Sequence, residues 1–452
     1  MPQRSCDVLV IGAGAAGLAC AERCTTHHSL SVIVLEARSQ VGGRIRSAPW
    51  GARGEHALQH GAQWVHGARA ENPLLPLLER HGLRTLPRTD WERCKTWDRA
   101  DGARVGGGCV ESAWGASLRA HERALAERGA LEARVAAGEL RADCSLGEAY
   151  ERALAEDGDA DALLARFLER TDWVADYAAE LGQLSLLHFD ADLEFHSEDD
   201  RMVADGGLGE LARRMGGGLD VRLDTAVRSV AADGDGVLVC CAGGGQFVAQ
   251  RCVVTLPLAV LQAGAVQFTP ALPPRKLEAL ERIGVGEYHM VAMRFERPFW
   301  DVELDVLYFH DSGAAVDRSA PFPLFVNLEK ATPGIGTLVA HSTASAVAPL
   351  EAMGQAAAVE AALAVLRRAF GQDAVPAPVE TWSSDWSTDE CTRGAYSYLP
   401  VGAIPADRVA LAAPVGNVRF AGEATHTDYP STVHGALMSG QREADAIAVQ
   451  IM

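Results

Sequence analysis

Lysine is the scarcest charged residue in this chain of 452 residues. Lys95, Lys276 and Lys330 are its only three lysines, so any role that requires this side chain is restricted to these positions. Basic residues as a whole number 41 against 60 acidic residues, which gives a formal net charge of −19. Because nucleic acids attract basic surfaces, this balance argues against a nucleic-acid-binding protein. The acidity either attracts a cationic small molecule or serves only to keep the protein in solution.

Long apolar runs and closely spaced cysteine motifs are also missing. No run approaches the roughly 20 residues that a membrane-spanning helix needs, so we expect no membrane association. The ten cysteines include no Cys-x-x-Cys pair, no disulfide framework and no zinc-binding spacing, and we expect no bound metal. Scattered thiols fit a reducing compartment. With no secretory or peroxisomal signal, the cytoplasm is the expected location.

The first motif that is present is a dinucleotide fingerprint near the N-terminus. Two apolar runs, DVLVI and SVIVL, predict buried parallel strands, and a helix-forming segment that opens with GAGAAG lies between them. Gly12 permits the tight turn, Gly14 the approach of a pyrophosphate, and Gly17 the close packing of helix on strand. Glu36 ends the second strand, where its carboxylate can accept hydrogen bonds from ribose hydroxyls. The pattern therefore predicts a dinucleotide bound at a helix N-terminus.

Two further segments indicate FAD rather than NAD. Directly after Glu36, the stretch ARSQVGGRI resembles the Gly-Gly-Arg segment of glutathione-reductase-type FAD proteins, whose glycine backbone and arginine lie along the pyrophosphate. The segment GAQWVHG, residues 61–67, resembles the one that passes by the flavin ring in polyamine oxidases.

A third segment lies near the C-terminus. Residues 418–421 read as a strand, which runs into GEAT and then YPSTVHGA, and a helix is predicted from about Val433 to about Val449. Such a helix would direct free N–H groups and its positive end toward the flavin pyrimidine. Reduced flavin is negatively charged there, so this arrangement favours reduction.

Taken in this order, the motifs resemble the flavin amine oxidase family, especially animal polyamine oxidases and the lysine-specific histone demethylases. The resemblance is strongest over residues 7–46, 61–73, 253–301 and 386–444, and it is thin between about 75 and 200. It implies an α/β fold class: a Rossmann-like FAD-binding domain of the glutathione-reductase type with an α+β substrate-binding domain, as in the amine oxidase fold.

The implied FAD-binding domain is discontinuous. We expect it to comprise residues 1–75, 204–270 and 380–452, and the substrate-binding domain to comprise residues 76–203 and 271–379.

The resemblance also implies which residues hold FAD. Glu36 and Arg44 would bind the adenosine and pyrophosphate side, and Val227 would pair with adenine through its backbone. Trp386 would flank the dimethylbenzene ring, and Glu423 would bind the ribityl–phosphate region. The full set of expected cofactor-binding residues is Gly12, Gly14, Gly17, Glu36, Ala37, Arg38, Gly43, Arg44, Gly61, Ala62, Gln63, Trp64, Val227, Trp386, Gly422, Glu423, Thr432 and Val433. Alanine occupies position 395, where some mitochondrial relatives attach FAD through a cysteine, so FAD is expected to be non-covalent.

On the substrate side, the resemblance singles out His66, Met290, Tyr396 and Thr432. Tyr396 matches one of two aromatic residues that sandwich the substrate amine, and Thr432 takes the place of the other. This half cage leaves room for a substituted amine. His66 matches a histidine of animal polyamine oxidases; either it contacts the amine or a distal polyamine nitrogen, or it only packs near Trp64.

Met290 is the main departure from the family. A lysine usually occupies this position, where it holds a water against flavin N5 and assists the reaction with O2, but a thioether carries no charge and donates no hydrogen bond. Three interpretations stay open. The pocket uses His289 or a water held in another way and retains oxidase activity; the enzyme reacts slowly with O2 and passes electrons elsewhere; or Met290 lines a changed substrate pocket.

The rest of the chain is less specific. Residues 112–185 show the periodicity of several amphipathic helices, which we expect to cover the pocket. Residues 190–200 include six acids and form either a solvated loop or a rim that attracts polyamines. No insertion long enough for a helical tower and no additional N-terminal domain are evident, which argues against a chromatin demethylase. Oligomeric state is not predicted.

The expected function is FAD-dependent oxidation of a C–N bond in an amine, a polyamine or a related compound. A neutral amine would give hydride to flavin N5, O2 is the expected electron acceptor with H2O2 as product, and water would hydrolyse the imine to an aldehyde. The protein would supply orientation and an apolar site. The alternatives are an amine dehydrogenase with another acceptor, an amino-acid oxidase, for which Arg69 and Arg393 are the candidate carboxylate-binding residues, and a flavin-binding protein with little turnover.

Overall fold

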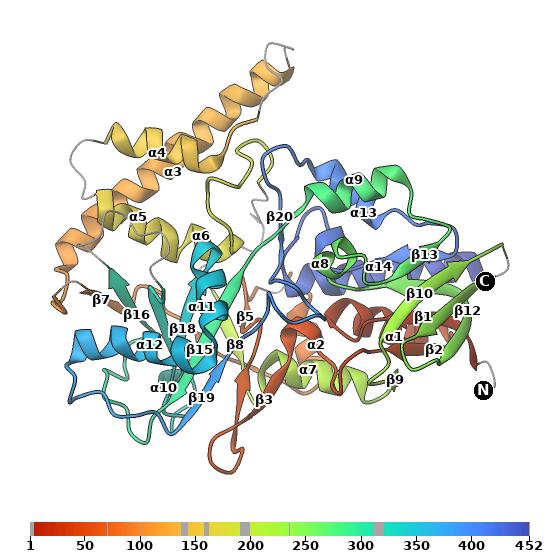
Figure 1. The fold of residues 1–452 in the computed structure, drawn as a ribbon, viewed down its shortest axis with the longest axis horizontal. Coiled ribbons are helices and arrows are strands. Elements are labelled where there is room, and N and C mark those ends of the chain that lie inside the picture. Colours follow the sequence, from red (N-terminus) through yellow and green to blue (C-terminus); the bar gives the residue numbers. More distant parts are fainter. Residues whose placement is uncertain are drawn as a thin grey trace.

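The computed structural model describes residues 4–69, 71–99, 101–136, 143–157, 162–189, 199–234, 236–310 and 321–451. Figure 1 shows two parts beside each other, one built on an eight-stranded sheet that carries both chain ends and one on a six-stranded sheet with helices above it. Within these ranges, no helix is both long and apolar enough to cross a membrane.

The eight-stranded sheet is built on the predicted fingerprint. Its strand β1 (Arg4–Ile11) pairs in parallel with the second fingerprint strand on one side and with a later strand on the other, and its apolar half, from Val8 to Ile11, is buried. The predicted strand at 418–421 also joins this sheet. In spatial order the strands are β13 (Gln267–Thr269), β10 (Val227–Ala232), β11 (Val237–Cys241), β12 (Gln246–Val254), β1 (Arg4–Ile11), β2 (Val32–Leu35) and β9 (Asp220–Arg222), with β21 (Val418–Phe420) beside β12.

Helices from the two ends of the chain pack together on this sheet. The helix of the fingerprint, α1 (Ala15–His28), lies against the last helix, α14 (Val433–Ile451), which confirms the predicted C-terminal helix. Contact is closest at Gly440, where a Cβ atom would lie 2.1 Å from the carbonyl oxygen of Ala16. The absence of a side chain at Gly440 therefore sets the distance between the two helices.

The six-stranded sheet has a different side-chain pattern on each face. Alternate residues of a strand point to opposite sides, so Val291 and Met293 pack against α11 (Val347–Met353) and α12 (Gln355–Phe370), whereas Met290 and Ala292 face Trp50, Leu58 and Met202. In spatial order the strands are β19 (Glu380–Ser383), β15 (Tyr288–Arg294), β18 (Thr337–Thr343), β17 (Leu324–Asn327), β16 (Val306–His310) and β7 (Cys94–Asp98). The predicted division into two domains stays a prediction. β19 begins at Glu380, the residue at which the predicted FAD-binding domain resumes.

The predicted helical region is confirmed. It contains α3 (Gly107–Ala136), α4 (Leu146–Ala155), α5 (Ala162–Thr171) and the short α6 (Trp173–Tyr177), which share one apolar cluster. Of the acidic run at 190–200, residues 190–198 lie outside the described residues.

The remaining strands are β3 (Ser47–Trp50), β4 (His56–Gln59), β5 (Trp64–Val65), β6 (Thr85–Arg88), β8 (Arg201–Val203), β14 (Gly284–Val285) and β20 (Ser397–Tyr398). The remaining helices are α2 (Leu74–Arg80), α7 (Gly207–Gly216), α8 (Leu258–Gln262), α9 (Pro274–Arg282), α10 (Leu328–Ala331), α13 (Pro405–Ala412) and the 3₁₀ turns Gly43–Ile45, Ala344–Ala346 and Glu423–Thr425.

Candidate active site

The glycine-rich loop forms an open cradle at the N-terminus of α1. Gly12 has a φ of +104°, and a Cβ at Gly17 would lie 1.9 Å from the carbonyl oxygen of Gly12, so the loop requires glycine at both positions. Gly14 precedes the helix and makes no side-chain cap, and a Cβ there would have no neighbour nearer than 4.0 Å. The first N–H groups of α1 therefore face open space beside a flexible backbone, which is the arrangement that binds a phosphate.

Glu36 fixes this loop to the end of β2. Its buried carboxylate accepts hydrogen bonds from the backbone N–H of Ala13 at 2.7 Å and of Arg38 at 3.0 Å. The carbonyl oxygen of Glu36 accepts a hydrogen bond from Thr225, two residues before Val227, so the predicted adenosine-binding residues come together here. A carboxylate has about four acceptor positions, which leaves Glu36 able to accept from ribose hydroxyls as well.

Arg38 and Trp386 belong to a second group of contacts. Arg38, which follows Ala37, pairs with Asp389 through a short ion pair. The guanidinium of Arg46 lies 4.9 Å from the ring centre of Trp386, a cation–π contact. Trp386 is buried, and a Cβ at Gly61 would approach its ring to 3.3 Å, so the predicted flavin-ring segment and Trp386 are in contact.

Arg44 and Glu423 form an ion pair at the centre of the site. Arg44, in the turn with Gly43, donates to Glu423 at 2.9 Å and to the carbonyl oxygen of Ala395 at 2.5 Å. Glu423 also accepts from the hydroxyl of Ser397 at 2.6 Å and from the N–H of Ser431 at 2.9 Å. Burial alone would raise the pKa of Glu423, but Arg44, Ser397 and the buried Arg408 lower it below its ordinary value, so Glu423 is ionised.

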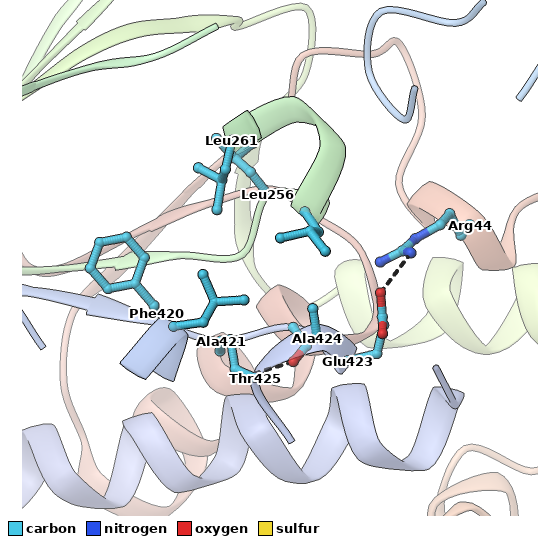
Figure 2. Close-up of a pocket in the computed structure, with 11 residues that line it drawn as sticks. Arg44, Leu256, Leu261, Phe420, Ala421, Glu423, Ala424 and Thr425 are labelled. Carbon is cyan, nitrogen blue, oxygen red and sulfur yellow. Dashed lines mark hydrogen bonds and ion pairs between the residues drawn. The ribbon is translucent and has the colours of Figure 1, made fainter. Parts of the chain in front are cut away.

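A pocket opens beside this ion pair. Figure 2 shows Arg44 and Glu423 on one side of it and apolar side chains such as Leu261 and Phe420 on the other. Gly422 has a φ of +128°, and no atom lies within 4 Å of the position that a Cβ would occupy there, so a guest can reach the backbone. The lining residues are Arg44, Leu256, Leu258, Leu261, Leu411, Phe420, Ala421, Gly422, Glu423, Ala424 and Thr425.

Thr432 caps α14 rather than presenting a free hydroxyl. Its oxygen accepts from the N–H of Gly435 at 3.0 Å, and its hydroxyl donates to the carbonyl oxygen of Tyr429 at 2.9 Å. Substrate contact by Thr432 is thus left to its methyl group. Val433 begins the helix, so its N–H belongs to the unsatisfied first turn that the sequence places near the flavin.

On the substrate side, Tyr396 meets residues that the sequence did not single out. Its hydroxyl donates to the carbonyl oxygen of Ala175 in α6 at 2.9 Å, and its ring centre lies 6.3 Å from that of Tyr288. The next residue in α6, Asp176, is solvent-accessible, although the protein around it is close enough to raise its pKa. Asp176 also raises the pKa values of Tyr288 and Tyr396, so the three residues lie near one another beside an accessible space.

This space is acidic. Burial raises the pKa of Asp176 above its ordinary value, Asp172 and Asp200 raise it further, and His66 opposes the shift. Burial also raises the pKa of Asp172. Among the described residues, no lysine or arginine contributes to the electrostatics of Asp176, so a cationic guest would gain the most from this space.

His66 is held by an acid rather than only packed beside Trp64. Its Nδ1 lies 3.2 Å from Asp200, which also accepts hydrogen bonds from the indole of Trp91 at 3.0 Å and from the N–H of Gly67 at 3.4 Å. The His66 side chain is 54% exposed, so it can still contact a guest. Although burial would raise the pKa of Asp200, these partners lower it below its ordinary value.

Met290 lies on the site side of β15, and His289 does not. The side chain of His289 is buried on the opposite face, against the hydroxyl of Ser383 at 3.0 Å and near Glu351 at 3.9 Å. The interpretation in which His289 replaces the missing lysine is therefore wrong. Met290 instead contacts Gln63, whose Nε2 lies 3.7 Å from its sulfur.

Sequence reasoning missed Tyr288, His341, Asp172 and Asp176. Tyr288 could have been found, because strand alternation places it on the same face as Met290. Asp172 and Asp176 are four residues apart, a spacing that places them on one side of a helical turn. His341 gave no local signal, since only the pairing of β15 with β18 brings it here.

Comparisons with known proteins agree with this fold. Residues 15–448 match the family described as flavin containing amine oxidoreductase. The chain is 33% identical over 99% of its length to "Lysine-specific histone demethylase 1 homolog 2" of Oryza sativa subsp. japonica, but covers 57% of that protein, so it spans little more than half of such relatives. It is 31% identical to "Polyamine oxidase 2" of Arabidopsis thaliana, with 100% of this chain and 90% of that protein covered. A structure of putrescine oxidase bound to putrescine has the same fold, with a TM-score of 0.76 at 23% identity over 99% of this chain and 100% of that one.

Proposed function

The chain belongs to the flavin-containing amine oxidoreductase family, and from this we propose that it binds FAD without a covalent bond and oxidises a small diamine or polyamine with O2 as electron acceptor. The observation that carries the substrate class is the accessible carboxylate of Asp176, with its raised pKa, near Tyr396 and Tyr288. We further propose the cytoplasm as its location, because all ten cysteines are unpaired thiols.

The residues present fit a flavin dinucleotide. The cradle at Gly14 accommodates a pyrophosphate at the positive end of α1, and Glu36 offers acceptors to a ribose. The ion pair of Arg44 with Glu423 would serve the pyrophosphate and ribityl region. Ala395 is buried with its carbonyl oxygen held by Arg44, and an alanine cannot form a thioether link.

Non-covalent binding is directly testable. Acid precipitation of the yellow protein should leave all of the flavin in the supernatant, because no side chain bonds to it. Mass spectrometry of the pellet should give the mass of the unmodified chain. A yellow pellet with an added flavin mass would refute this part of the proposal.

Charge supports an amine with two or more cationic groups. One nitrogen must lie uncharged beside Tyr396 for its α C–H bond to be oxidised, and a second, protonated nitrogen would be stabilised by Asp176, Asp172 and the His66–Asp200 pair. The protein around Asp172 and Asp176 raises the pKa of both carboxylates, so a charge beside them is screened less than in bulk water. A diamine or polyamine provides both states in one molecule.

FAD, when bound, accepts a hydride from the amine and passes two electrons to O2, which forms H2O2. The protein orients the reaction. Tyr396 would present one aromatic face to the amine, and the hydrogen bond to Ala175 holds that ring in place. Because the hydroxyl of Thr432 donates to Tyr429, its methyl group is the part that would face the amine. The N-terminus of α14 would favour negative charge on the bound cofactor.

An amino-acid oxidase is disfavoured by the same charges. Its substrate carries a carboxylate, which would lie among Asp172, Asp176 and Asp200 with no described lysine or arginine acting on Asp176 to balance it. An amine dehydrogenase with another acceptor differs only in the second half-reaction, so the geometry of the amine site does not distinguish it.

The deciding experiment mixes the purified yellow protein with putrescine, spermidine, spermine, N-acetylspermine, benzylamine and L-leucine. Without oxygen, we expect rapid bleaching of the flavin by a diamine or polyamine and none by L-leucine. In air, the same amine should release H2O2. Bleaching without H2O2 would establish a dehydrogenase, and failure of every diamine and polyamine to bleach the flavin would refute the proposed substrate class.

A further inference from the structure

Met290, part of an apolar cluster, also lies beside polar groups with which a thioether cannot pair strongly. Its cross-strand partner is His341, directly opposite it in the antiparallel pair of β15 and β18. Gln63 approaches the Met290 sulfur to 3.7 Å, and Trp64, the next residue, has its ring centre 6.4 Å from the imidazole of His341. Gln63 and His341 therefore both lie beside Met290.

Each of these two side chains has one buried polar atom without a partner among the described residues. These atoms are Oε1 of Gln63 and Nε2 of His341, and the residues are 2% and 3% exposed. Rotating the amide of Gln63 would exchange its oxygen and nitrogen and still leave one of them unpaired, because a thioether is a weak partner. Buried polar groups in native proteins are almost always satisfied, so two exceptions that both lie beside Met290 point to a bound polar guest.

The chemistry of the two atoms defines the guest. His341 is neutral, since burial lowers its pKa to about 3, and its Nδ1 is joined to the hydroxyl of Tyr288 at 2.8 Å. Burial and Asp176 raise the pKa of Tyr288, which keeps its proton. Neither Gln63 nor His341 offers a charge, so the site fits a small neutral molecule that can both donate and accept hydrogen bonds.

We propose that Gln63 and His341 hold an ordered water beside Met290, and that they act as positioning residues for reoxidation of the flavin by O2. This inference rests on the proposed function, because it assumes that FAD lies against the segment that contains Gln63. In reoxidation two electrons and one proton leave the reduced cofactor, a second proton comes from solvent, and O2 becomes H2O2. The held water supplies the hydrogen bonds that a lysine would otherwise organise at position 290.

The hydrogen bond between His341 and Tyr288 joins this water to the amine site. Tyr288 lies between the imidazole and Tyr396, with ring centres 5.7 Å and 6.3 Å away. A chain of contacts thus runs from Tyr396 through Tyr288 to His341 beside Met290: a ring contact followed by one hydrogen bond. This chain distinguishes the proposed water from an isolated filler of a packing defect.

The first test is kinetic. The FAD-bound protein is photoreduced without any amine and then mixed with O2, so its reoxidation is measured independently of the proposed substrate. Gln63→Leu and His341→Leu should each slow reoxidation about tenfold, the effect of one well-placed hydrogen bond in the transition state. The double variant should be no slower than the slower single variant, because both residues hold the same water.

A matched control is His289→Leu. It removes a buried imidazole next to Met290 in β15, on the opposite face of the sheet. Its reoxidation rate should stay within about twofold of that of the parent. Anaerobic reduction by the amine should be retained in His289→Leu. If the amine fails to reduce the parent while the photoreduced series behaves as stated, the proposed function fails and this inference stands.

The second test does not depend on activity. A high-resolution crystal structure of the oxidised FAD-bound protein should show an isolated density peak within hydrogen-bonding distance of both Gln63 and His341, and the peak should be lost in Gln63→Leu. Unchanged reoxidation in both single variants would overturn the inference. So would a structure in which an atom of FAD itself occupies the site.

Discussion

The hydroxyl of Tyr396 donates a hydrogen bond to the carbonyl oxygen of Ala175 at 2.9 Å, across 221 positions of the sequence. It connects the C-terminal part of the chain to α6, a short helix from the region where family resemblance is thin. Asp176 follows Ala175 directly, so the same bond fixes the distance between the ring of Tyr396 and the helix that carries Asp176.

Removing this hydrogen bond should weaken amine binding more than turnover. Tyr396→Phe retains the ring and loses the link to α6, so we expect KM for the best diamine to rise about fivefold with kcat nearly unchanged. Tyr396→Ala also removes the aromatic wall and should lower kcat/KM about a hundredfold. Steady-state kinetics measure both, and equal effects of the two substitutions would contradict the division of roles.

Glu423→Gln should impair cofactor binding. Glu423 is a buried partner of Arg44, and removing one charge of such a pair costs about 3–5 kcal/mol. We expect weaker FAD retention, seen as a lower ratio of flavin to protein absorbance after gel filtration. Glu443→Gln is the matched control, because Glu443 pairs with Arg419 at 2.8 Å and is equally buried but lies outside the pocket. It should reduce stability while retaining FAD.

The same carboxylate predicts a pH dependence. Because the pKa of Glu423 is lowered in the folded protein, its contribution to stability is fully present above the pKa of an unfolded glutamate and is lost as the pH falls through the folded pKa. FAD retention should therefore decline in acid in the parent protein. The measurement is release of flavin, followed by its fluorescence as the pH is lowered. Glu423→Gln has no carboxylate to titrate at this position, so its release profile should be flatter than that of the parent.

Asp176→Asn should raise stability and lower substrate affinity. The folded pKa of Asp176 is raised, so its ionisation destabilises the fold increasingly as the pH rises above the pKa of an unfolded aspartate. The variant should melt at a higher temperature than the parent, by more at about pH 8 than at about pH 5, and KM for a diamine should rise about tenfold or more. Asp301→Asn, at an exposed ion pair with Lys95, should change neither quantity. A variant that melts lower at the higher pH would contradict the assignment.

Gly17→Ala should abolish FAD binding. A methyl group there would lie 1.9 Å from the carbonyl oxygen of Gly12, so the loop must move away from its phosphate-binding shape. Gly129→Ala is the control, since Gly129 lies in α3 with no atom within 4 Å of an added Cβ. It should stabilise that helix by about 0.5–1 kcal/mol. Retention of FAD by Gly17→Ala would contradict the loop geometry.

Local pattern was enough to predict the cofactor half of the fold. The strands and helix around Gly12, Gly14 and Gly17 follow from short-range sterics, and the helix from Val433 follows from its apolar period, so both could be predicted without tertiary information. Glu36 was predicted from its place at the end of the second fingerprint strand, Arg44 and Glu423 were found through resemblance, and the structure adds the hydrogen bonds that hold all three.

The substrate half could not be predicted to the same depth. The partner of Tyr288 is 53 residues away on another strand. Asp176 belongs to no motif, and its raised pKa comes from the protein that surrounds it. The prediction for His289 failed because it considered neighbours in sequence, whereas adjacent residues of a strand point to opposite faces. The hydroxyl of Thr432, in turn, is used to cap a helix, a role that spacing alone did not reveal.

The contact of Gly440 with Ala16 joins α1 to α14, and this has a consequence for biosynthesis. A nascent chain on the ribosome exposes the glycine-rich loop early but lacks Glu423 and α14 until these late segments have been translated. The cofactor-binding half therefore completes its packing only after α14 has emerged. A ribosome that stalls before the codon for Glu423 leaves a chain whose first helix packs on the sheet but lacks its contact with α14.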